Sequence, residues 1–171
     1  MIGIKIFGAS IILAGCCYAG FSSATAINKE INSLRVLLSS LDFMSCELQY
    51  KLTPLPDLCK QTAEETKGNL SGVFMHLSEE LDNQISPDVK SCMRAAISKT
   101  KALPDATKKC LLQLGGSLGR FDLNGQINGI ESVRDSCKRR LSALETDKDS
   151  RIKIFKTLGI CAGAAIVILF A

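Results

Sequence analysis

The sequence predicts an all-α fold, an antiparallel six-helix bundle flanked by an N-terminal and a C-terminal transmembrane helix. Apolar residues recur at steps of three and four through the middle of the chain, and no useful stretch alternates apolar and polar residues. A charge-free run lies at each end. At 171 residues the chain is long enough for one compact domain and too short for two sizeable ones.

The two charge-free runs set the predicted domain boundaries. Residues 6–28 carry no charge, and a helix rising about 1.5 Å per residue crosses a hydrocarbon core of about 30 Å over that length. Residues 157–171 are also uncharged, and we expect this shorter run either to span a membrane with little tilt or to begin near Ile154 and Phe155, with Lys156 reaching outward to the membrane surface. We therefore expect a short segment at 1–5, transmembrane helices at 6–28 and 157–171, and a helical bundle at 29–156.

The first bundle helix is predicted to continue directly from the first membrane run. Thr53 ends it, because a residue before proline is disfavoured in the helical conformation. A second helix begins there and runs to about Thr66, with Thr53 as its cap and Pro54 and Pro56 in its first turn. The apolar stripe of the first helix consists of Ile27, Ile31, Leu34, Leu38, Leu41, Ser45, Leu48 and Leu52.

Three short helices follow, each with its own start signal. The third comes after Gly68, the fourth has Ser86 as cap and Pro87 as its first residue, and the fifth opens at Pro104. Glycines weaken and end the fifth helix. They are Gly115, Gly116 and Gly119.

The last helix is predicted to start at Asp122 as N-cap and to point back into the second membrane run. Its stripe consists of Leu123, Ile127, Ile130, Val133, Cys137, Leu141 and Leu144. Six helices that alternate in direction return the chain to the end where the first helix entered. This closure agrees with a membrane anchor at each terminus.

A cluster of cations before the second membrane run predicts the orientation. Because cytoplasmic loops near membrane segments are rich in Lys and Arg, the bundle is placed in the cytoplasm. The same residues are candidates for contact with the membrane surface, or alternatively form a solvated helix face with Glu145, Asp147 and Asp149 nearby. They are Lys138, Arg139, Arg140, Lys148, Arg151, Lys153 and Lys156.

Composition argues against catalysis, metal binding and nucleic-acid binding. The eight cysteines form no CxxC pair and the chain has one histidine, so no zinc site, catalytic residue or cofactor is expected. A net charge of +4 falls short of a nucleic-acid footprint. Four of the bundle cysteines lie at or beside apolar helical positions, which predicts reduced, buried thiols at Cys59, Cys92, Cys110 and Cys137.

A different topology is predicted by residues 13–16, Leu-Ala-Gly-Cys, which form a lipoprotein processing box. Cleavage before Cys16 would leave an externally displayed binding module lipidated at that residue. The apolar run continues well past Cys16 to Ile27, however, and the cationic cluster would then face outward. A membrane helix explains more of the sequence.

Two further features receive structural interpretations. His76 precedes Glu79 and Glu80 by three and four residues, which allows a proton-transfer pair or metal ligand but is more typical of a surface histidine. The glycines near Gly115 follow no strand and precede no G-K-[ST] sequence, so they indicate a helix end and close helix contact, not a phosphate cradle.

Two segments together carry a family resemblance. Leu52-Thr53-Pro54-Leu55-Pro56, after Glu47 and Tyr50, is the first, and residues 114–122, LGGSLGRFD, with Gln126 are the second. With the chain length and the terminal runs, they strongly resemble the stage III sporulation protein AB family. Phe121 departs from the small polar residue expected there, which puts in doubt the detail of that loop.

The resemblance implies a function. It implies a fold similar to the F-family platform proteins of type II secretion and type IV pili, and a place in the channel complex that joins the mother cell to the forespore. The implied partners are the stage III sporulation ATPase, protein AA, and other membrane proteins of that complex, with no nucleic acid and no small-molecule substrate. The implied location is the mother-cell membrane that faces the forespore.

The two motifs also have a physical interpretation. Turns at Pro54 and after Gly115 fix the angles between helices, so architecture alone can account for them. The alternative is a partner contact, since an exposed arginine in a fixed loop binds a carboxylate through two hydrogen bonds. The candidate partner-contact residues are Thr53, Pro54, Leu55, Pro56, Arg120 and Asp122.

Overall fold

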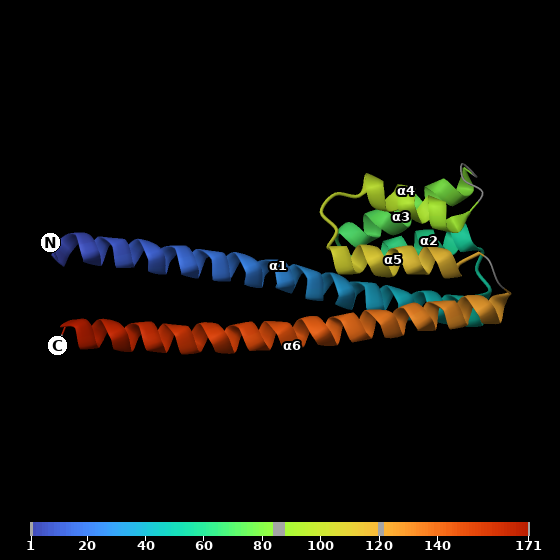
Figure 1. The fold of residues 1–171 in the computed structure, drawn as a ribbon. Helices are drawn as coiled ribbons and strands as arrows, with labels where there is room; N and C mark the ends of the chain where they lie inside the picture. The colour runs from blue at the N-terminus through green and yellow to red at the C-terminus, as the bar shows by residue number, and fades with distance from the viewer. Residues whose placement is uncertain (1, 84–87, 120–121, 171) are drawn as a thin grey trace. The chain divides into compact units, whose positions relative to one another are not determined.

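The computed structural model describes the backbone of residues 2–83, 88–119 and 122–170, and the side chains of 25–83, 88–119, 122–148 and 150. Within these ranges the protein consists of α-helices joined by loops and contains no strand, which confirms the predicted all-α class (Figure 1). Six helices are present, as predicted. They are α1 (Ile2–Lys51), α2 (Leu55–Glu65), α3 (Asn69–Asp82), α4 (Val89–Lys99), α5 (Asp105–Ser117) and α6 (Leu123–Phe170).

The chain divides into two compact units. One is Glu30–Ser142, which contains α2 to α5 together with the end of α1 and the beginning of α6. The other consists of the terminal segments Met1–Lys29 and Ala143–Ala171. The described part of the chain holds no helical stretch long and apolar enough to cross a membrane. Nearly all side chains of the runs 6–28 and 157–171 lie outside the described residues, so the structure gives those spans no support and they stay predictions.

The core of the Glu30–Ser142 unit is built by one face of every helix. Successive helices from α2 to α5 pack against one another in chain order. Phe74 of α3 is the largest of the fully buried side chains, and leucines of α1, α2, α3 and α5 are also fully buried. α6 contributes residues spaced by three and four, Ile130, Val133 and Cys137. The apolar residues at helical spacing thus form the buried face of this helix, as predicted.

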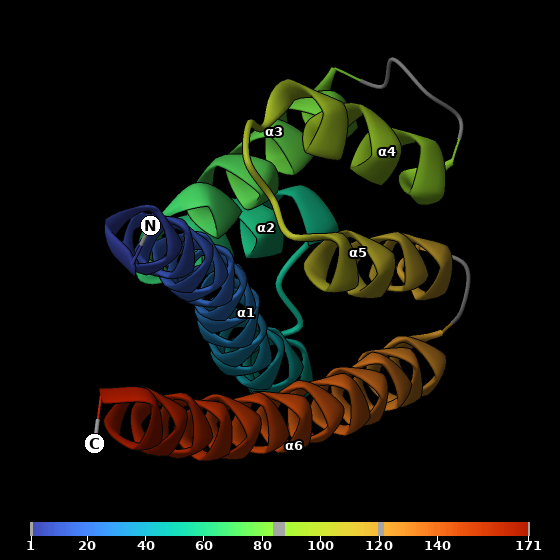
Figure 2. The same ribbon diagram turned by 60° about the vertical axis from the view of Figure 1, so that its left-hand side comes forward.

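Hydrogen bonds tie α1 to the short helices on one of its sides. Ser40 Oγ and the Oγ1 of Thr66, just after α2, lie 2.8 Å apart, and Thr107 Oγ1 of α5 donates to Ser33 Oγ at 3.0 Å. Figures 1 and 2 show α2 to α5 together on one side of the end of α1, with the beginning of α6 on another. The contact with α6 includes an ion pair of 2.8 Å between Asp42 Oδ1 and Arg134 Nε.

Two details of the predicted first two helices are wrong. The cap of α2 is Pro54, not Thr53, because Pro54 is extended at φ −55° and ψ 147° and its carbonyl already accepts the Leu58 N–H at 2.9 Å. The buried face of α1 includes Leu37 and Met44, while Leu52 is exposed. Because α1 is packed on two sides, its buried face is wider than the single apolar stripe that the sequence predicted.

The ends of the remaining helices agree in part with the prediction. The third begins after Gly68, whose φ of +74° is favourable for glycine. The predicted start of the fourth at Ser86 and Pro87 lies outside the described residues, and α4 begins after Asp88. α5 follows Pro104 as predicted but continues through Gly115 and Gly116 to Ser117.

Candidate functional site

The end of α1 carries an exposed leucine in an unfavourable backbone conformation. Leu52 follows the last helical residue, has φ +54° and is 65% exposed. The left-handed conformation ends the helix there, because Thr53 precedes a proline and is disfavoured in the helical region. For a residue other than glycine that conformation costs about 1–2 kcal/mol. Leu52 therefore combines backbone strain with an apolar side chain in water.

Two further exposed apolar residues lie at the same end of the unit. Within the described part of the chain, the large exposed hydrophobic residues are Tyr50 at 78%, Leu52 and Leu123 at 36%. α1 and α6 run in opposite directions in this unit, and the Asp42–Arg134 ion pair joins them (Figure 1). The residues that follow Asp42 on α1 therefore lie at the same end of the unit as the residues that precede Arg134 on α6. We call Tyr50, Leu52 and Leu123 the α1-end surface.

The structure brings the two sequence motifs together beside this surface. A Cβ built on Gly119 would lie 2.5 Å from Val89 Cγ2 and 3.8 Å from Leu55 Cδ2. Gly119 also has φ +74°, so both its conformation and its surroundings require glycine. Leu55 and Pro56 are half-buried, whereas Pro54 is exposed. The candidate residues of the first motif therefore pack next to the loop that contains the second.

Asp122 is the N-cap of α6, as predicted. Its carbonyl accepts the Gln126 N–H at 2.9 Å, and its Oδ1 accepts the Gly125 N–H at 3.0 Å. The side chain is exposed, so it is also accessible from solvent. Arg120 and Phe121 lie outside the described residues.

We expect Asp122→Ala to lower the free energy of unfolding by about 1 kcal/mol, because one N–H in the first turn of α6 loses its acceptor. Asp122→Asn keeps an acceptor oxygen and should change the free energy of unfolding by only a few tenths of about 1 kcal/mol. Thermal unfolding of the two variants beside the wild-type chain measures the difference. Equal stability of the alanine and asparagine variants would contradict a capping role.

The predicted membrane-surface residues are described in part. Lys138, Arg139 and Arg140 are exposed on α6 and Lys148 is half-buried, as part of a helix that continues beyond them. The side chains of Arg151, Lys153 and Lys156 lie outside the described residues, as does that of Cys16. The described cations of α6 are thus accessible to a charged surface.

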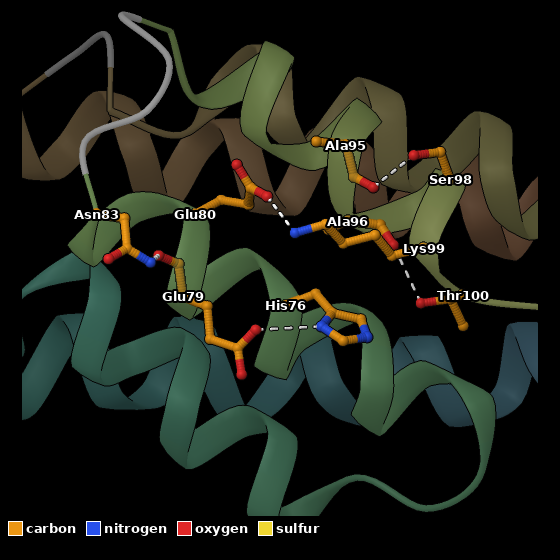
Figure 3. Close-up of polar contacts among 9 residues, drawn as sticks. All are labelled: His76, Glu79, Glu80, Asn83, Ala95, Ala96, Ser98, Lys99 and Thr100. Carbon is orange, nitrogen blue, oxygen red and sulfur yellow. Dashed lines mark hydrogen bonds and ion pairs between the residues drawn. The ribbon is translucent and has the colours of Figure 1, made fainter.

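The histidine forms a simple surface pair. His76 Nδ1 lies 3.2 Å from Glu79 Oε2, and both side chains are substantially exposed. Glu80, which the sequence placed with them, is buried and instead accepts a 2.6 Å hydrogen bond from Lys99 Nζ across α3 and α4 (Figure 3). This bond raises the pKa of Lys99. No group of three metal-ligating side chains occurs among the described residues.

Gly115 makes a close helix contact, as predicted from the sequence. A Cβ at Gly115 of α5 would lie 2.7 Å from Met93 Cβ and 3.3 Å from Lys90 Cα of α4. Its neighbour Gly116 has no atom within 4 Å of such a position. One glycine of the pair is therefore needed for packing and the other is not.

The described cysteines are free thiols. The predicted burial is confirmed for Cys59, Cys92, Cys110 and Cys137, whereas Cys46 is exposed. Burial raises the pKa of Cys59 to about 12, which keeps it neutral. The sequence did not indicate that Cys110 and Cys137, on different helices, contact each other.

Comparison with known proteins places this fold and its motifs in one group. Residues 5–171 match the family model described as stage III sporulation protein AB. Stage III sporulation protein AB of Bacillus subtilis (strain 168) is 25% identical over 169 residues, covering 97% of this chain and 98% of that protein. A solved structure of a stage III sporulation protein AB, 22% identical, covers 71% of this chain and 98% of its own with a TM-score of 0.62. These relatives are named for sporulation, not for an enzymatic reaction.

Proposed function

Since the chain belongs to the stage III sporulation protein AB family, a family of sporulation proteins, we propose that it is a non-catalytic membrane platform or adaptor of the mother cell–forespore channel complex. In this role it recruits the cytoplasmic stage III sporulation ATPase, protein AA, and other stage III membrane proteins. Residues 6–28 and 157–171 anchor it in the mother-cell membrane, with the bundle in the cytoplasm. The proposal includes a relationship to the F-family platform proteins of secretion systems.

The observation that carries the recruiting role is Leu52. Its φ of +54° favours glycine or asparagine, and its exposed side chain gains little from folding. Folding alone therefore gives no reason for leucine at this position. A partner that covers the side chain does, because burial of a leucine contributes about 1.5–3 kcal/mol.

The surroundings of Leu52 favour a protein partner. Tyr50 and Leu123 are also exposed apolar residues, and large side chains such as tyrosine are enriched where proteins meet. The Pro54 turn and the loop at Gly119 lie beside them with backbones fixed by proline and by packing. A rigid apolar surface loses little conformational entropy when it binds.

The cations of α6 support the membrane part of the proposal. Lys138, Arg139 and Arg140 are exposed on a helix that leads toward the second predicted membrane run. Each basic residue near an anionic leaflet contributes about 1 kcal/mol of attraction. Together with Lys148, Arg151, Lys153 and Lys156 they would orient the bundle without replacing the two membrane segments.

Leu52→Gly tests the recruiting role. The change relieves the left-handed strain, so we expect the free energy of unfolding to rise by about 1 kcal/mol. Co-purification of the ATPase with the full-length protein from membranes should fall about tenfold, because a side chain at the centre of the contact is lost.

Ala102→Gly is the matched control. Ala102 is an exposed residue at φ +60° in the loop before α5, so the substitution relieves the same kind of strain away from the α1-end surface. It should keep full association with the ATPase. The proposal fails if Leu52→Gly keeps that association too, or if both variants lose it equally.

A further inference from the structure

Two buried cysteines meet between α5 and α6. Cys110 and Cys137 are each 0% exposed, and they lie close enough for each thiol to shift the pKa of the other. A second close approach of the two helices supports this register, since a Cβ on Gly129 would lie 2.6 Å from Ser117 Cβ. From Cys110 to Ser117 and from Cys137 back to Gly129 is about two helical turns on each helix. The two contacts therefore belong to one antiparallel helix pair.

The electrostatic surroundings distinguish the two thiols. The pKa of Cys110 is lowered, mainly by the hydrogen bond from the Cys137 thiol and also by the nearby Arg140 guanidinium. The same hydrogen bond raises the pKa of Cys137. The pair thus holds one thiolate more readily than an isolated buried cysteine, and that thiolate is on Cys110.

Cys59 and Cys46 have different surroundings from this pair. Burial, with a smaller contribution from the charge of Asp82, raises the pKa of Cys59 to about 12, and a neutral thiol is a poor nucleophile. Cys46 is exposed and gives a thiol without a buried partner for comparison. We therefore expect Cys110 to react with oxidants more readily than Cys59, although both thiols are buried.

We propose that Cys110 and Cys137 form a peroxide-sensitive dithiol site that closes into an intramolecular disulfide between α5 and α6. The Cys110 thiolate attacks one oxygen of hydrogen peroxide, which breaks the O–O bond and gives a sulfenic acid and hydroxide. Cys137 then attacks that sulfur, the S–S bond forms, and the sulfenic oxygen leaves as hydroxide. The two thiol protons convert both hydroxides to water, so two thiols and one peroxide give one disulfide and two waters.

Peptide mapping of the full-length protein in detergent tests the site. After treatment with hydrogen peroxide and alkylation of the remaining thiols, trypsin should release the segment 110–120 linked to 135–138, lighter than the two separate peptides by two hydrogen atoms. A reducing agent should separate them. The proposal is overturned if Cys110 and Cys137 remain alkylated as free thiols while Cys46 is oxidised, or if Cys110 links to another cysteine instead.

Single substitutions separate the two roles. In Cys137→Ala, the sulfenic acid on Cys110 has no partner, so dimedone should trap it there. In Cys110→Ala, Cys137 should stay reduced under the same treatment, because burial still raises its pKa once the contact with Cys110 is gone. Trapping on Cys137 in preference to Cys110 would contradict the assigned order. Mapping of the wild-type chain decides the proposal even if a variant fails to fold.

Arg140 is a positioning residue in this scheme. Arg140→Gln removes the cation beside Cys110 and should slow disulfide formation roughly three- to tenfold. The matched control is Arg139→Gln, which makes the same charge change at a side chain that bonds Ser136. Equal rates in the two variants would remove Arg140 from the site, and faster oxidation in Arg140→Gln would contradict the proposed thiolate.

Discussion

Phe74→Ala is expected to lower the free energy of unfolding of the Glu30–Ser142 unit by about 3–5 kcal/mol. Phe74 is fully buried in α3, and truncation to alanine removes its burial and leaves a cavity among helices that pack on several sides. The buried Cys59 thiol reports the opening of this unit. Because about 1.4 kcal/mol is a factor of ten, its alkylation rate should rise by more than about a hundredfold.

Tyr50→Ala is the matched control, since it removes an aromatic ring that is 78% exposed. Its effect on stability should stay within about 0.5 kcal/mol. Similar labelling of Cys59 in the two variants would show that Phe74 does not lie in the core of the unit.

Gly115→Ala is expected to destabilise the same unit by about 1–3 kcal/mol. The added methyl group would lie 2.7 Å from Met93 Cβ and 3.3 Å from Lys90 Cα, and neither of these atoms belongs to the flexible end of a side chain. α4 and α5 therefore have to move apart. The thermal midpoint of the full-length protein measures the loss.

Gly116→Ala, one residue away, is expected to stabilise the protein. No atom lies near its added methyl group, and alanine is favoured over glycine inside a helix by about 0.5–1 kcal/mol. The thermal midpoint should therefore rise in this variant. A loss of stability at Gly116 equal to that at Gly115 would contradict the contact with α4 as the cause of the loss at Gly115.

Much of the fold was predictable because local signals mark each helix end. Pro54 and Pro104 begin helices, Gly68 separates two of them, and Asp122 caps α6. These residues act through their own backbone and the first turn, which sequence spacing records directly. The predicted helix order follows from such signals without any knowledge of packing.

The features that escaped prediction depend on contacts between distant helices. The sequence assigned Leu52 to the buried stripe of α1, because spacing alone does not reveal that the helix ends one residue earlier. Glu80 was placed with His76 along one helix, whereas it bonds Lys99 of the next. The contact between Cys110 and Cys137 depends on the register of α5 against α6, which no local pattern encodes.

The position of α1 at the start of the chain has a consequence for biosynthesis. Its contacts include Thr107 of α5 and Arg134 of α6, which come much later in the chain, whereas α2 to α5 pack against neighbours in sequence. At about 5–20 residues per second, several seconds pass between the emergence of Ser33 and that of Thr107 from the ribosome. During that interval α1 lacks its contacts with α5 and α6, so the nascent chain presents an aggregation-prone helix that molecular chaperones would recognise.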